Sequence, residues 1–188
     1  MTAKGLATRQ RIVLAAALLI REKGTAETTL SDVGTATSTG RSQLFHYFPN
    51  GRIDVLVAVA RYEAEQVLES QRPHLDDLGS WESWQAWRQS VLRHYDMYGR
   101  KCPLGSLTSE LGKTSPEAEH IVTELFVSWE AALLRGTTAL IPDHERATDC
   151  AKSILAAIQG GVALLRATNR MDYLDRALAL AIEPMQHA

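Results

Sequence analysis

The sequence predicts an all-α protein, made of an N-terminal three-helix module and a larger helical region after it. Apolar residues recur at spacings of three and four along almost the whole chain, which is the repeat of a single helix face. No stretch shows the strict alternation of apolar and polar residues that a half-buried strand requires. With 188 residues, 45% of them apolar and 22% charged, the chain has the composition of a folded protein with one large or two small domains.

The first predicted helix covers about residues 8–23. Its apolar stripe consists of Ile12, Ala15, Ala16, Leu19 and Ile20. Gly24 follows directly and is suited to cap the C-terminus of the helix. This helix supplies one side of a small core.

The second predicted helix begins at about Leu30. Thr29 and Asp32 fit the capping-box pattern, in which a hydroxyl and a carboxylate satisfy backbone N–H groups at a helix start. The helix cannot run far, because residues 34–40 are mostly small or β-branched and favour a turn.

The third predicted helix begins at about Arg41. Leu44, Phe45 and Phe48 form its apolar stripe and are assigned to the core, and the Pro-Asn-Gly sequence at residues 49–51 ends it. A pair of short helices in this arrangement is a helix-turn-helix, whose last helix enters a DNA major groove. We therefore predict a DNA-binding domain at residues 1–52.

The charge of the chain is distributed in agreement with this prediction. Residues 1–52 hold seven Lys and Arg against three acids, giving +4, whereas residues 53–188 hold 13 basic and 19 acidic residues, giving −6. Binding to phosphates needs a locally positive potential. The positive end of the chain is the end that carries the motif.

Residues 53–188 are predicted to form a helical ligand-binding and dimerisation domain. The expected helices cover roughly residues 53–70, 80–98, 115–138, 146–168 and 171–182, with one further short turn at 104–111. The first of them follows the helix-turn-helix almost at once. Any tilt of that helix would therefore be passed to the DNA-binding domain.

Aromatic residues are concentrated in two of these helices, and all four tryptophans lie there. Large rigid side chains with a few polar neighbours can line a cavity for a small apolar or aromatic ligand. Ordinary core packing is the alternative. The residues assigned to ligand binding are Trp84, Arg88, Tyr95, Tyr98, Cys102, Phe126 and Trp129.

The last two predicted helices each carry an apolar stripe, which suggests a symmetric four-helix interface between two copies of the chain. A Gly-Gly pair at 160–161 would allow close helix approach, although packing within one chain is the alternative. The residues assigned to the dimer interface are Ile154, Leu155, Ile158, Gly161, Val162, Leu165, Leu174 and Leu178.

Several other classes of protein find no support in the sequence. There is no signal peptide and no uncharged apolar span of 18 residues, so we expect a cytoplasmic protein without a membrane partner. Cys102 and Cys150 are interpreted as reduced thiols; a redox role for Cys102, beside two basic residues, is the alternative. No motif indicates catalysis, a metal or a cofactor, so we expect no enzyme.

The DNA contacts are assigned by side-chain chemistry. Arg41 and Gln43 are assigned to base edges, because arginine pairs bidentately with guanine and glutamine with adenine; Arg41 could equally hold a phosphate. His46 would touch a base or a methyl group, or remain a solvated surface residue. The residues assigned to phosphates or to added positive charge are Lys4 on a flexible arm, Thr29, Ser42, Tyr47 and Arg52, with Thr29 possible as a simple cap.

The N-terminal residues resemble those of a known family. The sequence RIVLAAA at 11–17, the Thr-Thr pair at 28–29 and LFHYF at 44–48 are similar to the tetracycline-repressor-like (TetR/AcrR) family of bacterial regulators, whose usual signature is LYHYF. The CPLGSL sequence at 102–107 and Gln-Gly-Gly at 159–161 resemble a subgroup related to drug- and flavonoid-responsive repressors. The resemblance implies a homodimer that reads a palindromic DNA operator and is released by a small-molecule effector.

Two positions depart from the family pattern. The turn usually reads Gly-Val-Ser, and here it reads Ser38-Thr39-Gly40, so we expect Thr39 to take over the capping role and to lie at the DNA. Arg52 replaces the usual lysine of a PxGK sequence, which keeps the charge but not necessarily the contact.

The sequence thus predicts a ligand-responsive transcriptional regulator, most simply a repressor. The alternatives are a helical ligand-binding protein that no longer reads DNA, and a helical enzyme that uses the aromatic cavity.

Overall fold

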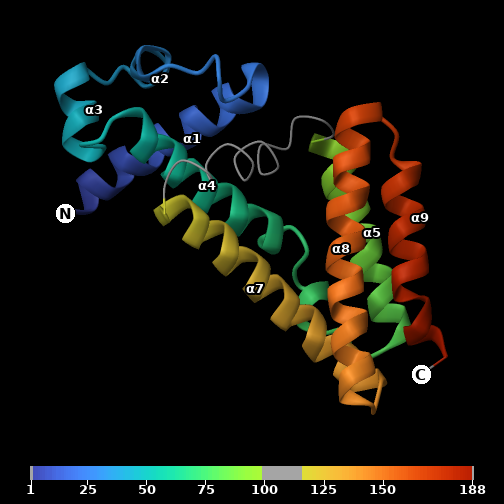
Figure 1. The fold of residues 1–188 in the computed structure, drawn as a ribbon. Coiled ribbons are helices and arrows are strands. Elements are labelled where there is room, and N and C mark those ends of the chain that lie inside the picture. The colour runs from blue at the N-terminus through green and yellow to red at the C-terminus, as the bar shows by residue number, and fades with distance from the viewer. Residues whose placement is uncertain (1, 99–115, 188) are drawn as a thin grey trace. The chain divides into compact units, whose positions relative to one another are not determined.

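The computed structural model describes residues 2–98 and 116–187, and every regular element in these ranges is a helix (Figure 1). The α-helices are α1 Ala3–Lys23, α2 Leu30–Thr37, α3 Arg41–Tyr47, α4 Arg52–Glu69, α5 Trp81–Tyr98, α7 Pro116–Leu140, α8 His144–Thr168 and α9 Asp172–Ile182, with 3-10 turns at His74–Asp76 and Glu183–Gln186. The all-α prediction is confirmed. The predicted turn at 104–111 and Cys102 lie outside the described residues.

The described chain divides into two compact units. The first holds the residues up to Glu65 together with the start of α7, up to Thr123. The second holds the chain from Gln66 onward, apart from that part of α7. Helices α4 and α7 therefore each begin in the first unit and end in the second.

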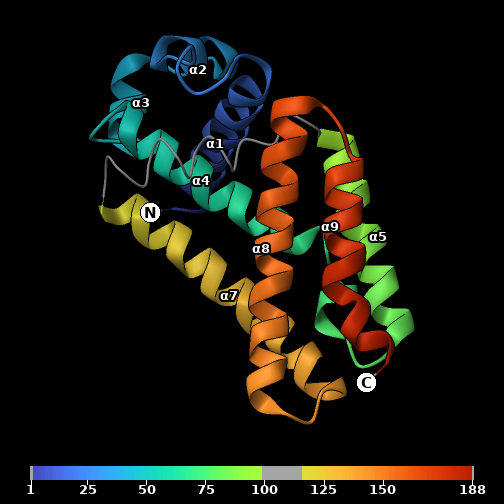
Figure 2. The same ribbon diagram turned by 45° about the vertical axis from the view of Figure 1, so that its right-hand side comes forward.

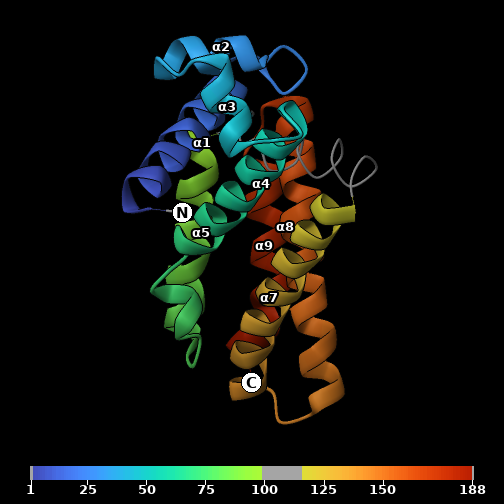
Figure 3. The ribbon, with the colours of Figure 1, turned by 90° about the vertical axis from the view of Figure 1, so that its left-hand side faces the viewer.

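In the first unit, α2 and α3 pack over α1 (Figure 3). The core between them contains Ile12, Val13, Ala16, Ile20, Val33, Leu44 and Phe48, with Val55 and Val59 from the start of α4. The α1 helix begins earlier than expected, because the Thr2 hydroxyl accepts a hydrogen bond from the Gly5 N–H and caps it. Lys4 therefore lies in the first turn of α1, and its prediction as part of a flexible arm is wrong.

In the second unit, α8 and α9 run side by side, with α5 next to α9 (Figure 2). The indole N–H groups of Trp87 and Trp129 both donate to the Gln71 Oε1 atom, at 2.9 and 3.1 Å. Asp143 caps the start of α8, and Asn169 in the left-handed conformation ends it.

Helix α8 is long and apolar enough to cross a membrane by length and composition alone. That observation is weak evidence, because a core helix of a soluble protein meets the same conditions. Ile154 and Ile158 of α8 are fully buried within the chain. The apolar character of this helix therefore has an explanation in packing.

Candidate nucleic-acid interface

A capping box fixes the start of α2. The Asp32 carboxylate accepts hydrogen bonds from the Thr29 backbone N–H at 2.8 Å, the Thr29 hydroxyl at 2.7 Å and Lys23 Nζ at 2.7 Å. Lys23 and then Thr29 hold the pKa of this carboxylate well below its ordinary value. The Thr29 hydroxyl donates its one proton to Asp32. Thr29 therefore acts as a helix cap in the structure, which was the alternative to a phosphate contact.

The turn between α2 and α3 has a left-handed residue at Ser38, with φ 50° and ψ 40°. Thr39 is buried, and its hydroxyl donates to the Thr37 carbonyl at 3.3 Å. Gly40 is the residue that precedes α3, and no side chain caps the helix there. The expectation that Thr39 caps α3 is therefore wrong, and its burial removes Thr39 from the predicted DNA contacts.

The recognition helix α3 presents a polar face above a buried one. Leu44 and Phe48 are buried, as predicted. Arg41, Ser42, Gln43 and His46 are all exposed, and Tyr47 is half-buried beside the core. Phe45 is 39% exposed, so its assignment to the core is wrong. Sequence periodicity missed this, because Phe45 adjoins Leu44 and both are apolar.

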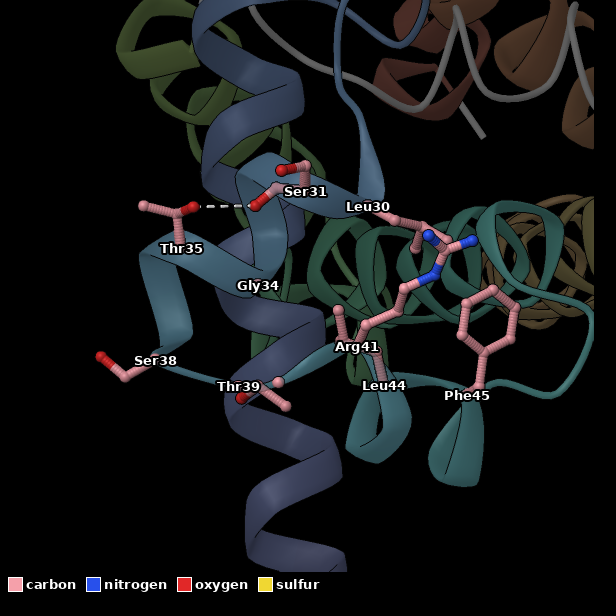
Figure 4. A pocket seen from close by; sticks show the side chains of 10 residues that line it. Leu30, Ser31, Gly34, Thr35, Ser38, Thr39, Arg41, Leu44 and Phe45 are labelled. Carbon is pink, nitrogen blue, oxygen red and sulfur yellow. Dashed lines mark hydrogen bonds between the residues drawn. The ribbon is translucent and has the colours of Figure 1, made fainter.

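A groove of about 540 Å³ lies between α2 and α3 (Figure 4). Its lining residues include Leu30, Ser31, Gly34, Thr35, Ser38, Arg41, Leu44 and Phe45. The Arg41 guanidinium carbon lies 5.7 Å from the centroid of the Phe45 ring, within the range of a cation–π contact. The groove thus combines an aromatic ring, one positive charge and several hydroxyl groups.

Arg52 is already engaged within its own unit. Its Nε atom donates to the Thr28 carbonyl at 3.1 Å, and its Nη2 atom donates to the Thr25 carbonyl. Both threonines are buried in the connection between α1 and α2. The exposed Arg52 side chain thus fixes the start of α4 to that connection, and its assignment to a DNA phosphate stays a prediction.

A second tie joins α4 to the first helix. Arg21 Nη2 donates to both Oε atoms of Glu63, at 2.8 and 2.9 Å. Glu63 is buried, and burial raises the pKa of its carboxyl in spite of the arginine. No local sequence pattern indicates this pair, because 42 residues separate its members.

Three of the seven predicted ligand-binding residues form core in the second unit. Trp84, Tyr95 and Trp129 are buried, so the alternative of ordinary packing describes them. Arg88 is paired with Asp175 of α9, and Phe126 is half-buried. Of the predicted set, Tyr98 lines a groove of about 410 Å³ at the surface of this unit. The other lining residues are Gln66, Glu69, Ser70, Arg72, His74, Ser90, Arg93, His94 and Met97.

The predicted dimer residues are also largely used inside the chain. Seven of the eight are buried, the exception being the half-buried Leu155. A Cβ atom at Gly161 would lie 2.6 Å from the Leu174 Cα atom, so this glycine allows α8 and α9 of one chain to approach closely. The buried members, Ile154, Ile158, Gly161, Val162, Leu165, Leu174 and Leu178, are thereby corrected to packing within one chain.

The opposite faces of α8 and α9 are the exposed ones. Leu164, Tyr173 and Leu180 are 45%, 37% and 68% exposed, respectively. Small residues Ala156, Gly160 and Ala163 are exposed on α8 as well. The apolar and small residues of this face are visible in the sequence. The prediction selected the adjacent stripe instead, because that stripe is more strongly apolar.

Two family models match the chain. The model for bacterial regulatory proteins of the tetR family matches residues 12–52, and the model for the C-terminal domain of LmrA/YxaF-like transcriptional regulators matches residues 82–179. The first match covers the helix-turn-helix, and the second covers more than half of the chain.

Relatives of known sequence are similar over most of their length. The uncharacterized HTH-type transcriptional regulator Rv0196 of Mycobacterium tuberculosis is 28% identical over 178 residues, which cover 89% of this chain and 88% of that protein. The uncharacterized HTH-type transcriptional regulator YxaF of Bacillus subtilis is 25% identical over 173 residues, which cover 90% of each.

Solved structures share the fold. A TetR-family transcriptional regulator from Cytophaga hutchinsonii superposes with a TM-score of 0.78 at 22% identity, covering 100% of this chain and 97% of that one. A TetR transcriptional regulator from Legionella pneumophila gives 0.74 at 18% identity, covering 98% of each chain. With its two matched domains, this chain belongs to the TetR family of bacterial transcriptional regulators, and its C-terminal domain is of the LmrA/YxaF-like type.

Proposed function

We propose that the protein is a cytoplasmic repressor that binds a palindromic operator as a homodimer and releases it when a small aromatic effector binds. Its family is one of ligand-responsive transcription regulators that are not enzymes. The observation that carries the proposal is the exposed polar face of α3 above buried Leu44 and Phe48. This is the arrangement that a recognition helix needs in order to enter a major groove.

The proposed base contacts are Arg41 and Gln43, with His46 at a base or a methyl group. Ser42 and Tyr47 would contact phosphates, and Lys4 in the first turn of α1 would add positive charge near the backbone. Thr29 and Thr39 are left out, because their hydroxyl groups donate within the protein. Arg52 would add positive charge at the start of α4, where its side chain is exposed.

The proposed dimer forms through the exposed faces of α8 and α9. Leu164 and Leu180 are large apolar residues open to solvent, and Gly160 has nothing within 4 Å of a Cβ built on it. A small-residue stripe flanked by exposed apolar side chains allows two helices to approach closely. A two-fold dimer of this kind would bind an operator whose half-sites lie about 34–36 Å apart.

The effector is proposed to bind in the surface groove of the second unit. The groove has the volume of a small-molecule site, and the rings of His94 and Tyr98 lie 4.8 Å apart on its wall. Aromatic rings in a groove that also holds Arg93 and Glu69 fit an aromatic effector with a polar substituent. An effector that favours a conformation with weaker DNA binding is itself bound less tightly on DNA, by the same factor.

The first test measures DNA binding by fluorescence anisotropy, with an excess of unrelated duplex, on the intergenic DNA beside the gene and on sites from a genome-wide selection. We expect Arg41→Ala and Gln43→Ala each to lower specific affinity by about 1–3 kcal/mol. Arg135→Ala, an exposed arginine of α7, is the control matched in charge and should leave affinity unchanged. Saturable ligand binding without any sequence-selective DNA binding would instead indicate a ligand-binding protein.

The dimer is tested by analytical ultracentrifugation. Leu164→Glu and Leu180→Glu should shift the protein toward monomer, because each places a charge in the apolar interface. Val127→Glu changes a residue of α7 that is 62% exposed and should leave the dimer intact. Equal effects of all three would exclude this face.

A further inference from the structure

We infer that the groove between α2 and α3 receives the 5-methyl group of an operator thymine, and that Phe45 is the residue that specifies it. The inference rests on the proposed function, since it assumes that α3 lies in the major groove. It adds a base identity that the polar face of α3 does not provide.

Phe45 is an aromatic residue on the outside of the recognition helix. Its ring is 39% exposed, while its neighbour Leu44 and its helix partner Phe48 are buried. A phenylalanine has no polar atom to offer to a phosphate or to a base edge. The contact that it can make with a base pair is apolar, and the 5-methyl group of thymine is the apolar feature of the major groove.

The surroundings of Phe45 hold the ring in place. A Cβ atom built on Gly51 would lie 3.3 Å both from Leu30 Cδ1 and from Phe45 Cε1, so these two side chains border the same glycine. Gly51 itself has φ 67°, a backbone conformation that glycine adopts most readily. The ring of Phe45 and the side chain of Leu30 thus form an apolar wall at one end of the groove (Figure 4).

The rest of the groove is lined by both apolar and polar residues. Gly34 is one of its lining residues, and a Cβ there would lie 3.0 Å from the Thr39 carbonyl oxygen and 3.3 Å from Leu44 Cδ1, so the glycine allows α2 to pack closely against the turn and α3. On the α2 wall, the Thr35 hydroxyl already donates to the Ser31 carbonyl at 3.0 Å (Figure 4). The Thr35 donor is therefore occupied within α2, and the apolar lining of the groove comes from Leu30, Leu44 and Phe45.

Arg41 determines which thymine is read. Its guanidinium lies over the Phe45 ring at 5.7 Å, which leaves the in-plane N–H groups free to pair with guanine O6 and N7. Residues four apart on a helix lie about 6 Å apart, and successive base pairs about 3.4 Å apart. The thymine should therefore lie within two base pairs of the guanine that Arg41 contacts.

The experiment uses the full-length protein and the selected operator, with each thymine replaced in turn by deoxyuridine, which removes the methyl group alone. We expect one position per half-site at which wild-type affinity falls about fourfold, the effect of one buried methyl group. Phe45→Ala should bind the thymine and deoxyuridine operators equally at that position. Val127→Ala changes an exposed apolar residue of α7 that has no part in the proposed DNA contacts, and it should retain the difference.

Phe45→Leu keeps an apolar side chain and should retain part of the discrimination, which separates methyl recognition from a general disturbance of α3. The inference is overturned if the operator is bound specifically but no thymine is methyl-sensitive, or if Phe45→Ala keeps the full difference. If the wild-type protein shows no sequence-selective DNA binding at all, the proposed function is overturned, and this inference with it.

Discussion

Arg21 and Glu63 form a buried ion pair that joins α1 to α4, with one guanidinium nitrogen 2.8 and 2.9 Å from the two carboxylate oxygens. Arg52, at the start of the same helix, donates to two carbonyls of the connection between α1 and α2. Helix α4 is thus tied to the DNA-binding unit at two places. Helix α4 ends in the second unit. Any shift of this helix would therefore be passed to the DNA-binding unit through these two sets of hydrogen bonds.

Removal of Glu63 should destabilise the fold. Breaking a buried ion pair leaves an unpaired charge and costs about 3–5 kcal/mol. Arg21 keeps 17% of its side chain exposed and can partly recover hydration, so we expect about 2–3 kcal/mol for Glu63→Ala. The double variant Arg21→Met, Glu63→Leu should regain most of this loss, as measured by urea unfolding. A loss below about 0.5 kcal/mol for Glu63→Ala would contradict a structural role.

Asp32 should give the stability of the protein a dependence on acid pH. Its pKa is lowered in the folded state by Lys23 and Thr29, so the folded protein releases this proton more readily than the unfolded chain. The stabilisation is complete above the ordinary aspartate pKa of about 4 and is lost as the pH falls toward the lowered value. In urea unfolding, the stability advantage of wild type over Asp32→Asn should be constant from about pH 5 upward and shrink below pH 4. Glu27→Gln, an exposed carboxylate of the same unit, is the control, and an advantage that grew in acid would refute the assignment.

The helices could be predicted from the sequence because local signals determine them. The capping box of Thr29 and Asp32 marks the start of α2, and the apolar spacing of Leu44 and Phe48 marks the buried side of α3. Expected and observed boundaries differ by at most a few residues, the largest difference being the start of α1, where Thr2 provides a cap.

Side-chain roles were harder to predict, because they depend on contacts between distant parts of the chain. The sequence position of Trp129 fits either a pocket wall or the core. Its full burial and its hydrogen bond to Gln71, 58 residues away, show that it belongs to the core. The prediction that Gly161 allows two helices to approach closely is correct. The residue that it approaches is Leu174 of the same chain and not a residue of a second copy. Periodicity identifies an apolar face and does not identify what covers it.

Replacement of Ser38 by glycine should stabilise the first unit. Ser38 has φ 50°, and the left-handed conformation costs a residue with a Cβ about 1–2 kcal/mol. Glycine loses more chain entropy on folding, which offsets about 0.4–1 kcal/mol. We therefore expect Ser38→Gly to gain up to about 1 kcal/mol in thermal unfolding. Ser38→Ala removes the hydroxyl without relieving the backbone and should show no gain; an equal gain in both variants would exclude the backbone explanation.

Replacement of Gly136 by alanine should destabilise the second unit, although alanine is the better helix former. Gly136 lies near the C-terminal end of α7, where the propensity gain is at most about 1 kcal/mol. A Cβ there would lie 2.5 Å from Leu78 Cβ and 2.9 Å from Trp84 Cζ2, and such overpacking costs about 1–3 kcal/mol. Overlap with a Cβ atom and a fully buried indole has little room to relax, so we expect a net loss of about 1–2 kcal/mol in urea unfolding followed by tryptophan fluorescence. Gly79→Ala adds the same methyl group with only an ordinary contact, 3.5 Å from Asp77 Oδ1, and should stay within about 0.5 kcal/mol of wild type. A Gly136→Ala protein as stable as wild type would mean that α7 does not approach Leu78 and Trp84 this closely in solution.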